Sequence, residues 1–109
     1  MADQPLFHDL LALAAFDPTA VQKLDTFRTE RLFVGMNCVA RGQTQRVHTH
    51  DGADKFYLVL RGKARIAVGA ETRELGPGAI ALAPAGVPHG IAEALEDAVI
   101  LVAMAPPPR

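Results

Sequence analysis

Three of the four histidines of this chain occur in a pattern that could bind a metal ion. His48 and His50 lie one residue apart in the run RVHTH, and side chains alternate along a β-strand, so both imidazoles would project from the same face. His89 follows the turn-forming run PAGVP and could supply a third ligand from a distant strand. Taken singly, each histidine also fits a plainer interpretation, an exposed strand residue or a turn residue. His8 is interpreted as a surface or packing residue.

Two longer motifs surround these histidines. From Gly42 to Gly62 the chain reads glycine, five residues, His-x-His, four residues, Lys55, six residues and glycine. From Gly78 to His89 it reads glycine, five residues, proline, one residue, glycine, two residues and histidine. These stretches resemble the first and second motifs of the cupin superfamily, in which a glutamate stands where this chain has Lys55.

The resemblance implies an all-β fold, a double-stranded β-helix or jelly-roll barrel that is usually dimeric and has a pocket in its mouth. It also implies that His48, His50 and His89 belong to one metal site. It implies less about the reaction, because cupins include dioxygenases, isomerases, decarboxylases, sugar-binding proteins and storage proteins, and a fold does not define a function. A single such domain without a DNA-binding domain disfavours a regulator.

Lys55 changes what this site can bind. A protonated lysine has no lone pair, so it cannot coordinate a cation, and its charge repels a divalent ion. In one arrangement three imidazoles hold the metal and Lys55 turns away to pair with an acid such as Asp54 or Glu93. In a second, no metal is bound and Lys55 supplies the positive charge of a pocket for an anion. A third moves Asp54 into the ligand position through a β-bulge, which strand alternation opposes.

The ligand set limits the choice of cofactor. Imidazoles suit Zn, Ni, Fe or Cu and fit Ca or Mg poorly, so we expect a divalent transition metal, or no metal under the second arrangement. Tyr57 shares a strand face with Lys55, and Asn37 interrupts an apolar strand in a way that requires a polar partner. We assign Lys55, Tyr57 and Asn37 to ligand binding. The alternatives are core packing for Tyr57 and a satisfied buried amide for Asn37.

Short strands must position most of these residues. Leu6, Leu10 and Leu13 recur at helical spacing, which predicts a helix over residues 5–16 that caps the sheet or reaches a second subunit. Beyond it, branched and aromatic runs broken by Gly, Pro or charged residues indicate an all-β domain. The predicted strands are 21–28, 31–40, 45–50, 55–61, 63–69, 71–75, 79–83, 87–93 and 97–104. The predicted segments are an N-terminal helical segment (1–20), a cupin β-barrel (21–105) and a disordered tail (106–109).

Composition and charge exclude several classes of partner. The chain has 11 basic and 12 acidic residues without a block of like charges, so neither nucleic acid nor a membrane surface is expected as a partner. No apolar run approaches the roughly 18 residues of a membrane span and no leader is apparent, which predicts a cytoplasmic protein. Cys38 lies in an apolar run and is predicted to be a buried thiol. The runs FYLVL and AVILVAMA are apolar on both faces, which favours a homodimer.

The first functional hypothesis is a small metal-binding cupin that acts as a metal-dependent enzyme, dioxygenase-like or isomerase-like, on a small molecule. In it, Lys55 or Tyr57 orients an anionic or carbonyl oxygen. The alternative is a metal-free module that binds a small molecule or an anion without catalysis. A scaffold with a vestigial pocket is a third possibility. Lys55 weakens the first hypothesis and is the residue that favours the second.

Overall fold

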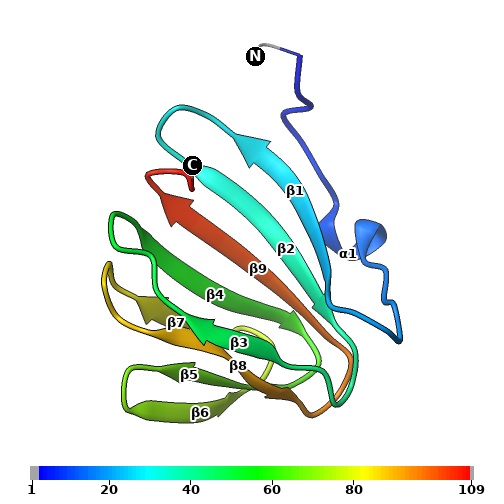
Figure 1. Ribbon diagram of the computed structural model, residues 1–109. Helices are drawn as coiled ribbons and strands as arrows, with labels where there is room; N and C mark the ends of the chain where they lie inside the picture. The colour runs from blue at the N-terminus through cyan, green and yellow to red at the C-terminus, as the bar shows by residue number, and fades with distance from the viewer. Residues whose placement is uncertain (1–2, 109) are drawn as a thin grey trace.

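Two antiparallel β-sheets and one short helix make up residues 3–108, which the computed structural model describes (Figure 1). Every predicted strand matches an observed strand to within two residues at each end, and the prediction of an all-β jelly roll is confirmed. Within the described residues the strands are β1 (Gln22–Arg28), β2 (Phe33–Val39), β3 (Gln45–His48), β4 (Asp54–Arg61), β5 (Ala64–Val68), β6 (Glu71–Leu75), β7 (Ile80–Ala83), β8 (His89–Ala94) and β9 (Ala98–Ala105).

The strands alternate between two sheets. The larger sheet has the order β1-β2-β9-β4-β7 and the smaller sheet the order β3-β8-β5-β6. After β2, β4 and β7 the chain crosses to the smaller sheet, and the last strand, β9, lies between β2 and β4 (Figure 1). This connectivity places β3 beside β8. The two histidine-bearing segments, which are far apart in the sequence, therefore become neighbours.

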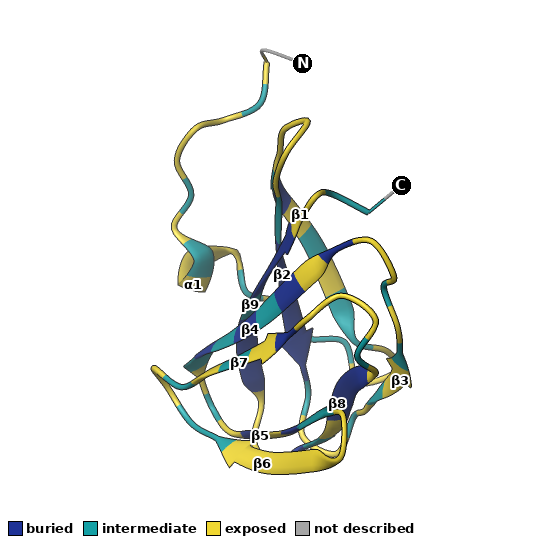
Figure 2. Ribbon diagram, turned by 90° about the vertical axis from the view of Figure 1, so that its left-hand side faces the viewer, coloured by how far each residue is buried: buried dark blue, intermediate teal, exposed yellow. Residues whose placement is uncertain are grey.

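The core lies between the sheets, and buried residues alternate with less buried ones along strands such as β4 (Figure 2). On β4, Lys55, Tyr57 and Val59 are buried, whereas the residues between them are less so. The surrounding cluster is apolar, and its buried members include Val39, Ile66, Ile91, Ile100 and Val102. Among the described residues, Lys55 is the only buried Lys, Arg, Asp or Glu.

The predicted helix over residues 5–16 is wrong in extent, because only α1 (Leu10–Leu13) is helical. Asp9 caps this single turn, its carboxylate accepting a hydrogen bond from the Ala12 amide at 3.3 Å. Leu6, which set the helical spacing, lies outside the helix and is 74% exposed. The leucine pattern therefore reflects a helix of one turn preceded by extended chain.

Contacts with β1, the edge strand of the larger sheet, keep the residues before Leu10 out of the helix. The Gln4 side chain exchanges two hydrogen bonds with the Arg28 backbone, and a His8 ring nitrogen lies 3.2 Å from the Thr26 carbonyl. The His8 ring also packs against Phe27, which confirms the packing role expected for this histidine. Short exposed helices are marginal in water, so these contacts with β1 decide the conformation.

The N-terminal segment covers part of the outer face of the larger sheet. Leu10 and Phe16 pack on a second apolar cluster, whose buried members are Met36, Cys38 and Val99. Cys38 is a buried free thiol, as predicted. Of the two expected roles, the segment takes that of capping the sheet of its own chain. It thereby covers some of the apolar surface that the sequence suggested a second subunit would cover.

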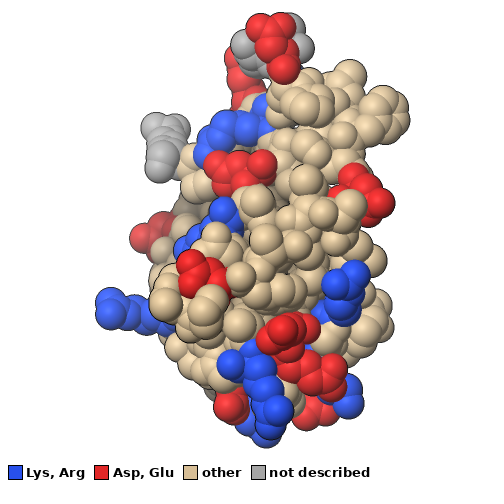
Figure 3. Space-filling view, turned by 90° about the vertical axis from the view of Figure 1, so that its right-hand side faces the viewer, with Lys and Arg blue, Asp and Glu red and all other residues tan. Residues whose placement is uncertain are grey.

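Beyond β9, residues 106–108 are irregular, and Arg28 donates a hydrogen bond to the Pro108 carbonyl at 3.0 Å. Residues 1, 2 and 109 lie outside the described part, so disorder of residues 106–109 stays a prediction, as do the segment boundaries. No helix within residues 3–108 has the length and apolar character needed to traverse a bilayer. Figure 3 shows positive and negative side chains interspersed at the lower end of one face.

Candidate metal centre

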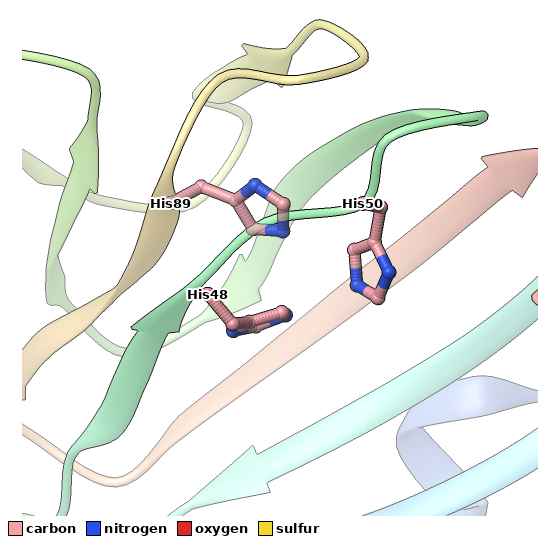
Figure 4. Close-up of side chains that lie close together, drawn as sticks. All are labelled: His48, His50 and His89. Atoms are coloured by element: carbon pink, nitrogen blue, oxygen red, sulfur yellow. The ribbon is translucent and has the colours of Figure 1, made fainter.

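His48 and His89 face each other across the β3–β8 pair. They are partners in the strand register, and their ring centroids are 4.5 Å apart. His50 lies just beyond the end of β3, and its ring centroid is 4.8 Å from that of His48 and 5.3 Å from that of His89. Figure 4 shows the three rings converging on one region. One ligand atom from each ring lies within 4.8 Å of the other two, so the structure brings all three predicted histidines together.

The turn before β8 fixes the loop that carries His50. The Gly86 amide donates a hydrogen bond to the His50 carbonyl oxygen at 3.0 Å, and the Val87 amide donates to the Pro84 carbonyl within the turn. Gly86 has a φ of +80°, a conformation that glycine adopts without steric cost. The proline and glycine of the second motif therefore orient both His89 and the loop of His50.

Backbone carbonyls orient two of the rings. His48 Nδ1 lies 2.9 Å from the Arg46 carbonyl oxygen, and His89 Nδ1 lies 3.0 Å from the Val87 carbonyl oxygen. Because a carbonyl only accepts hydrogen bonds, Nδ1 carries the proton in each ring and Nε2 keeps a free lone pair. Metal-binding histidines usually have this kind of support.

The electrostatic environment favours the neutral form of His50 and His89. Burial lowers the pKa of His50, and the positive charges of His48 and Lys55 lower it further. Burial is also the main cause of the lowered pKa of His89, and the charge of Lys55 adds to it against the opposing hydrogen bond with Val87. Neutral imidazoles are the form that coordinates a metal ion.

His89 provides the test of whether a metal fits. Its side chain is 1% exposed, and among the described residues its Nε2 is the buried side-chain nitrogen or oxygen that has no hydrogen-bond partner. Leaving such an atom unsatisfied costs about 1–3 kcal/mol. A metal ion shared with His48 and His50 would satisfy it. The three residues thus fit a transition metal, and the cluster is a possible three-histidine metal site.

Lys55 lines the same cavity as His48 and His50. It is 6% exposed, and its Nζ lies 4.7 Å from the centroid of the Tyr57 ring. Burial, and to a lesser extent the charge of Lys23, lowers the pKa of Lys55 to about 8. At neutral pH the cavity wall therefore still carries a buried ammonium group.

Within residues 3–108 the pairing of Lys55 with Asp54 or Glu93, expected in one arrangement, is not observed, and neither is the Asp54 bulge, which strand alternation opposed. Glu93 pairs with Arg65 at 2.9 Å, and Asp54 accepts a hydrogen bond from the Ala85 amide at 2.9 Å, so neither acid pairs with Lys55. The pairing of β4 with β9 runs in register through Asp54 and Lys55, without a bulge at this point. Asp54 therefore faces outward, and it does not move into the ligand position.

The other two predicted ligand-binding residues differ in their surroundings. Tyr57 is fully buried, burial raises its pKa, and its hydroxyl donates to Gln45 Oε1 at 3.3 Å. Its ring centroid lies 6.0 Å from that of His89, which makes Tyr57 a neighbour of the histidine cluster. Asn37 is 4% exposed and lines the cavity. The ligand-binding roles of Lys55, Tyr57 and Asn37 stay predictions.

The cavity beside the histidines has a volume of about 480 Å³, within the range of small-molecule sites. Sequence reasoning missed several residues of its wall, among them Lys23, Gln45, Arg46 and Met104. Lys23 lies opposite Asn37 in the pairing of β1 and β2, a register that the local sequence pattern does not reveal. The wall combines polar and apolar side chains and is open to a ligand beside the histidine cluster.

Fold and site together define a cupin. Residues 35–104 match the Cupin domain family, and the chain belongs to this family. Its fold is similar to that of TT1209 from Thermus thermophilus (41% identity, TM-score 0.88, 94% of this chain and 98% of that one). It also resembles an RmlC-like cupin from Desulfovibrio desulfuricans (27% identity, TM-score 0.87, 96% and 100% coverage). The SCO3923 protein of Streptomyces coelicolor is 34% identical over 84 residues, 77% of this chain and 79% of that protein.

Proposed function

We propose that this cupin binds one divalent transition metal ion, Zn, Ni, Fe or Cu, through His48, His50 and His89, and uses it in a dioxygenase-like or isomerase-like reaction on a small molecule. The observation that carries the proposal is the buried Nε2 of His89, which has no partner within residues 3–108 and belongs to a cluster whose ligand atoms lie within 4.8 Å of one another. Three imidazoles form a ligand set that suits a transition metal and leaves positions open for substrate.

The metal ion and the residues around the histidine cluster would have different roles in the reaction. The ion, when bound, supplies Lewis acidity toward a substrate oxygen or a water molecule. The carbonyl contacts of His48 and His89 hold the rings in orientation. Lys55 would orient an anionic oxygen of the substrate, and the buried side chains of Val102 and Met104 would limit the access of water.

Elemental analysis of protein purified without a histidine tag or a chelator tests the metal site. We expect about one transition metal ion per chain in the wild type, and a content near zero in His50→Ala and His89→Ala, because two imidazoles hold an ion weakly. His8→Ala is the matched control, since His8 packs against β1 outside the cluster, and it should keep the wild-type content. A wild-type content below about one tenth, even after metal addition, would overturn the proposal.

A metal-free binding module is the second candidate function, and Lys55 is the observation that favours it. A buried ammonium in the cavity wall opposes the binding of a second cation nearby and attracts an anion instead. The elemental analysis separates the two candidates. A protein that stays free of metal after metal addition, yet binds a small anion, would be the module without catalysis.

We also propose that two copies of the chain associate through the uncovered part of the outer face. Ile80 and Leu82 of the edge strand β7 are 59% and 61% exposed. In the strand register they lie opposite Leu58 and Phe56 of β4, so the four side chains share one apolar surface. Apolar surfaces and bare edge strands of this kind are usually covered in natural proteins.

A further inference from the structure

Two polar side chains of the cavity wall are available to a ligand. Lys55 is 6% exposed and Asn37 is 4% exposed, and both line the cavity beside the histidines. The ion pairs within residues 3–108 join other side chains, so none of them neutralises Lys55. Among the described residues His89 Nε2 is the fully enclosed side-chain atom without a partner, so the polar atoms of Lys55 and Asn37 still reach the open space of the cavity. A ligand in the cavity could therefore contact both.

The cavity wall carries more positive than negative charge. Lys23, Arg46 and Lys55 contribute cationic side chains, and Asp25 is the acid among the described lining residues. Asp25 is exposed, so it does not neutralise the buried ammonium of Lys55. A buried charge without a counter-charge is unfavourable, and an anionic ligand would remove this cost.

The strand register places the two polar side chains at different positions along the cavity wall. Lys55 lies opposite Met104 of β9, and Asn37 lies opposite Ile100 of the same strand. The backbone offset of four residues is about 13 Å, the Lys55 side chain extends from its own position toward the Tyr57 ring, and the buried side chain of Val102 lies between the two positions. A molecule with polar groups at both ends and carbon atoms between them fits this wall better than a single inorganic oxyanion.

We propose that the cavity binds a small organic carboxylate, whose carboxylate accepts hydrogen bonds from the Lys55 ammonium and whose far end carries a polar group for the Asn37 amide. Lys23, which lies opposite Asn37 at the rim, adds attraction for the anion. The inference names the substrate class of the site proposed above, and it rests on that proposal for the reactive part of the ligand.

Thermal unfolding of the protein as purified, at pH 7 and constant ionic strength, tests the inference with three probes: acetate, 6-hydroxyhexanoate and inorganic phosphate. Sodium chloride is the reference. Bound ligand raises Tm, and for a domain of this size a concentration several-fold above Kd should raise it by about 4 °C or more. We expect that shift with 6-hydroxyhexanoate, a smaller one with acetate, and almost none with phosphate.

Variants test whether the rise in Tm depends on Lys55 and on Asn37. Lys55→Met should abolish the carboxylate shift, and Lys55→Gln provides a second variant should the first fail to fold. Lys63→Met, at an exposed lysine outside the cavity, should keep the wild-type shift. Asn37→Leu should reduce the advantage of 6-hydroxyhexanoate over acetate. The inference is wrong if no carboxylate exceeds the chloride reference, if the Lys55 variants keep the shift, or if phosphate matches the carboxylates.

Metal content measured on the same samples separates this inference from the proposed function. Metal-free protein with a carboxylate shift that depends on Lys55 would refute the metal site and support the carboxylate site. Metal-loaded protein without a shift, or with a shift that survives in Lys55→Met, would support the metal site and refute the carboxylate anchor. In the latter case the probe would bind the metal alone.

Discussion

The Gly86 amide donates a hydrogen bond to the His50 carbonyl oxygen at 3.0 Å, and this bond joins the two sequence motifs at the histidine cluster. His50 lies beyond the end of β3, so strand pairing does not hold its backbone. Gly86 belongs to the turn that leads into β8 and His89. The position of one candidate ligand thus depends on the turn that precedes another.

Replacing Gly86 should therefore weaken metal binding as well as stability. At a φ of +80°, Gly86→Ala forces an L-residue into the left-handed region, at a cost of about 1–2 kcal/mol. We expect a lower Tm and, in a competition titration with a chelator, a larger Kd for the metal. Gly52→Ala is the control, because Gly52 follows His50 in the loop, has open space around it and lacks a positive φ. Unchanged metal affinity in Gly86→Ala would show that the turn does not position His50.

Lys55→Glu should tighten metal binding if Lys55 occupies the place of a fourth ligand. The substitution exchanges a repelling ammonium for a carboxylate in the cavity that His48 and His50 line. We expect an increase in metal affinity of at least about tenfold, with Lys55→Met between the two, since Met removes only the repulsion. Lys63→Glu, a surface change of equal charge, should leave the affinity unchanged. An equal affinity in Lys55→Glu and the wild type would place residue 55 outside the coordination sphere.

Stability should rise with pH between about pH 8 and pH 10 because of Lys55. Burial lowers the pKa of folded Lys55 from 10.5 to about 8, so over this range the unfolded chain binds more protons than the folded chain. The free energy of unfolding then increases by at most about 1.4 kcal/mol per pH unit. Above pH 10 the gain should reverse, because burial raises the pKa of Tyr57 and the folded chain then holds the extra proton.

Urea unfolding at pH 7, 8, 9 and 10 checks this pH dependence. Lys55→Met should be more stable than the wild type at pH 7, and its stability should change less with pH. Lys63→Met, at an exposed lysine, should follow the wild-type curve. If the free energy of unfolding changed equally with pH in the wild type and in Lys55→Met, the ammonium of Lys55 would not be held in a buried state.

Light scattering tests the proposed association of two copies. We expect a dimer at micromolar concentration, and a monomer for Leu82→Lys, because the new charge lies in the centre of the apolar surface of β7 and β4. Val47→Lys is a control at another exposed apolar residue, which is 53% exposed on β3 and belongs to the other sheet. A monomeric wild type would refute the proposed association, and a dimeric Leu82→Lys would show that the interface does not include the apolar surface of β7 and β4.

Local patterns were sufficient for the strands and for the inward face of β4, whereas the meeting of His89 with His48 and His50 was implied by the resemblance to cupins. Alternation along β4 predicted that Lys55 and Tyr57 share an inward face, and both are buried. The prolines and the glycine of residues 84–88 predicted a turn just before His89, and the Val87 amide donates a hydrogen bond to the Pro84 carbonyl within that turn. Each of these inferences uses neighbours within a few residues, where the periodicity of a strand and the chemistry of turns act directly.

Contacts between distant segments were beyond local patterns. The helix prediction failed because hydrogen bonds to β1 keep the residues before Leu10 extended. The expected pairing of Lys55 with Glu93 failed because Arg65 lies opposite Glu93 in the pairing of β5 with β8. The place of Lys23 in the cavity likewise depends on how β1 and β2 pack over the opposite sheet. Such competition for partners is decided by tertiary packing.

The central place of β9 has a consequence for biosynthesis. β2 and β4 do not pair with each other, and β9 provides the ladder that joins them. Before the segment from Ala98 onward is synthesised, the larger sheet can form at most two separate strand pairs, β1 with β2 and β4 with β7. Nascent chains therefore remain exposed to self-association until the final strand emerges, when non-local pairing closes the sheet in one late step.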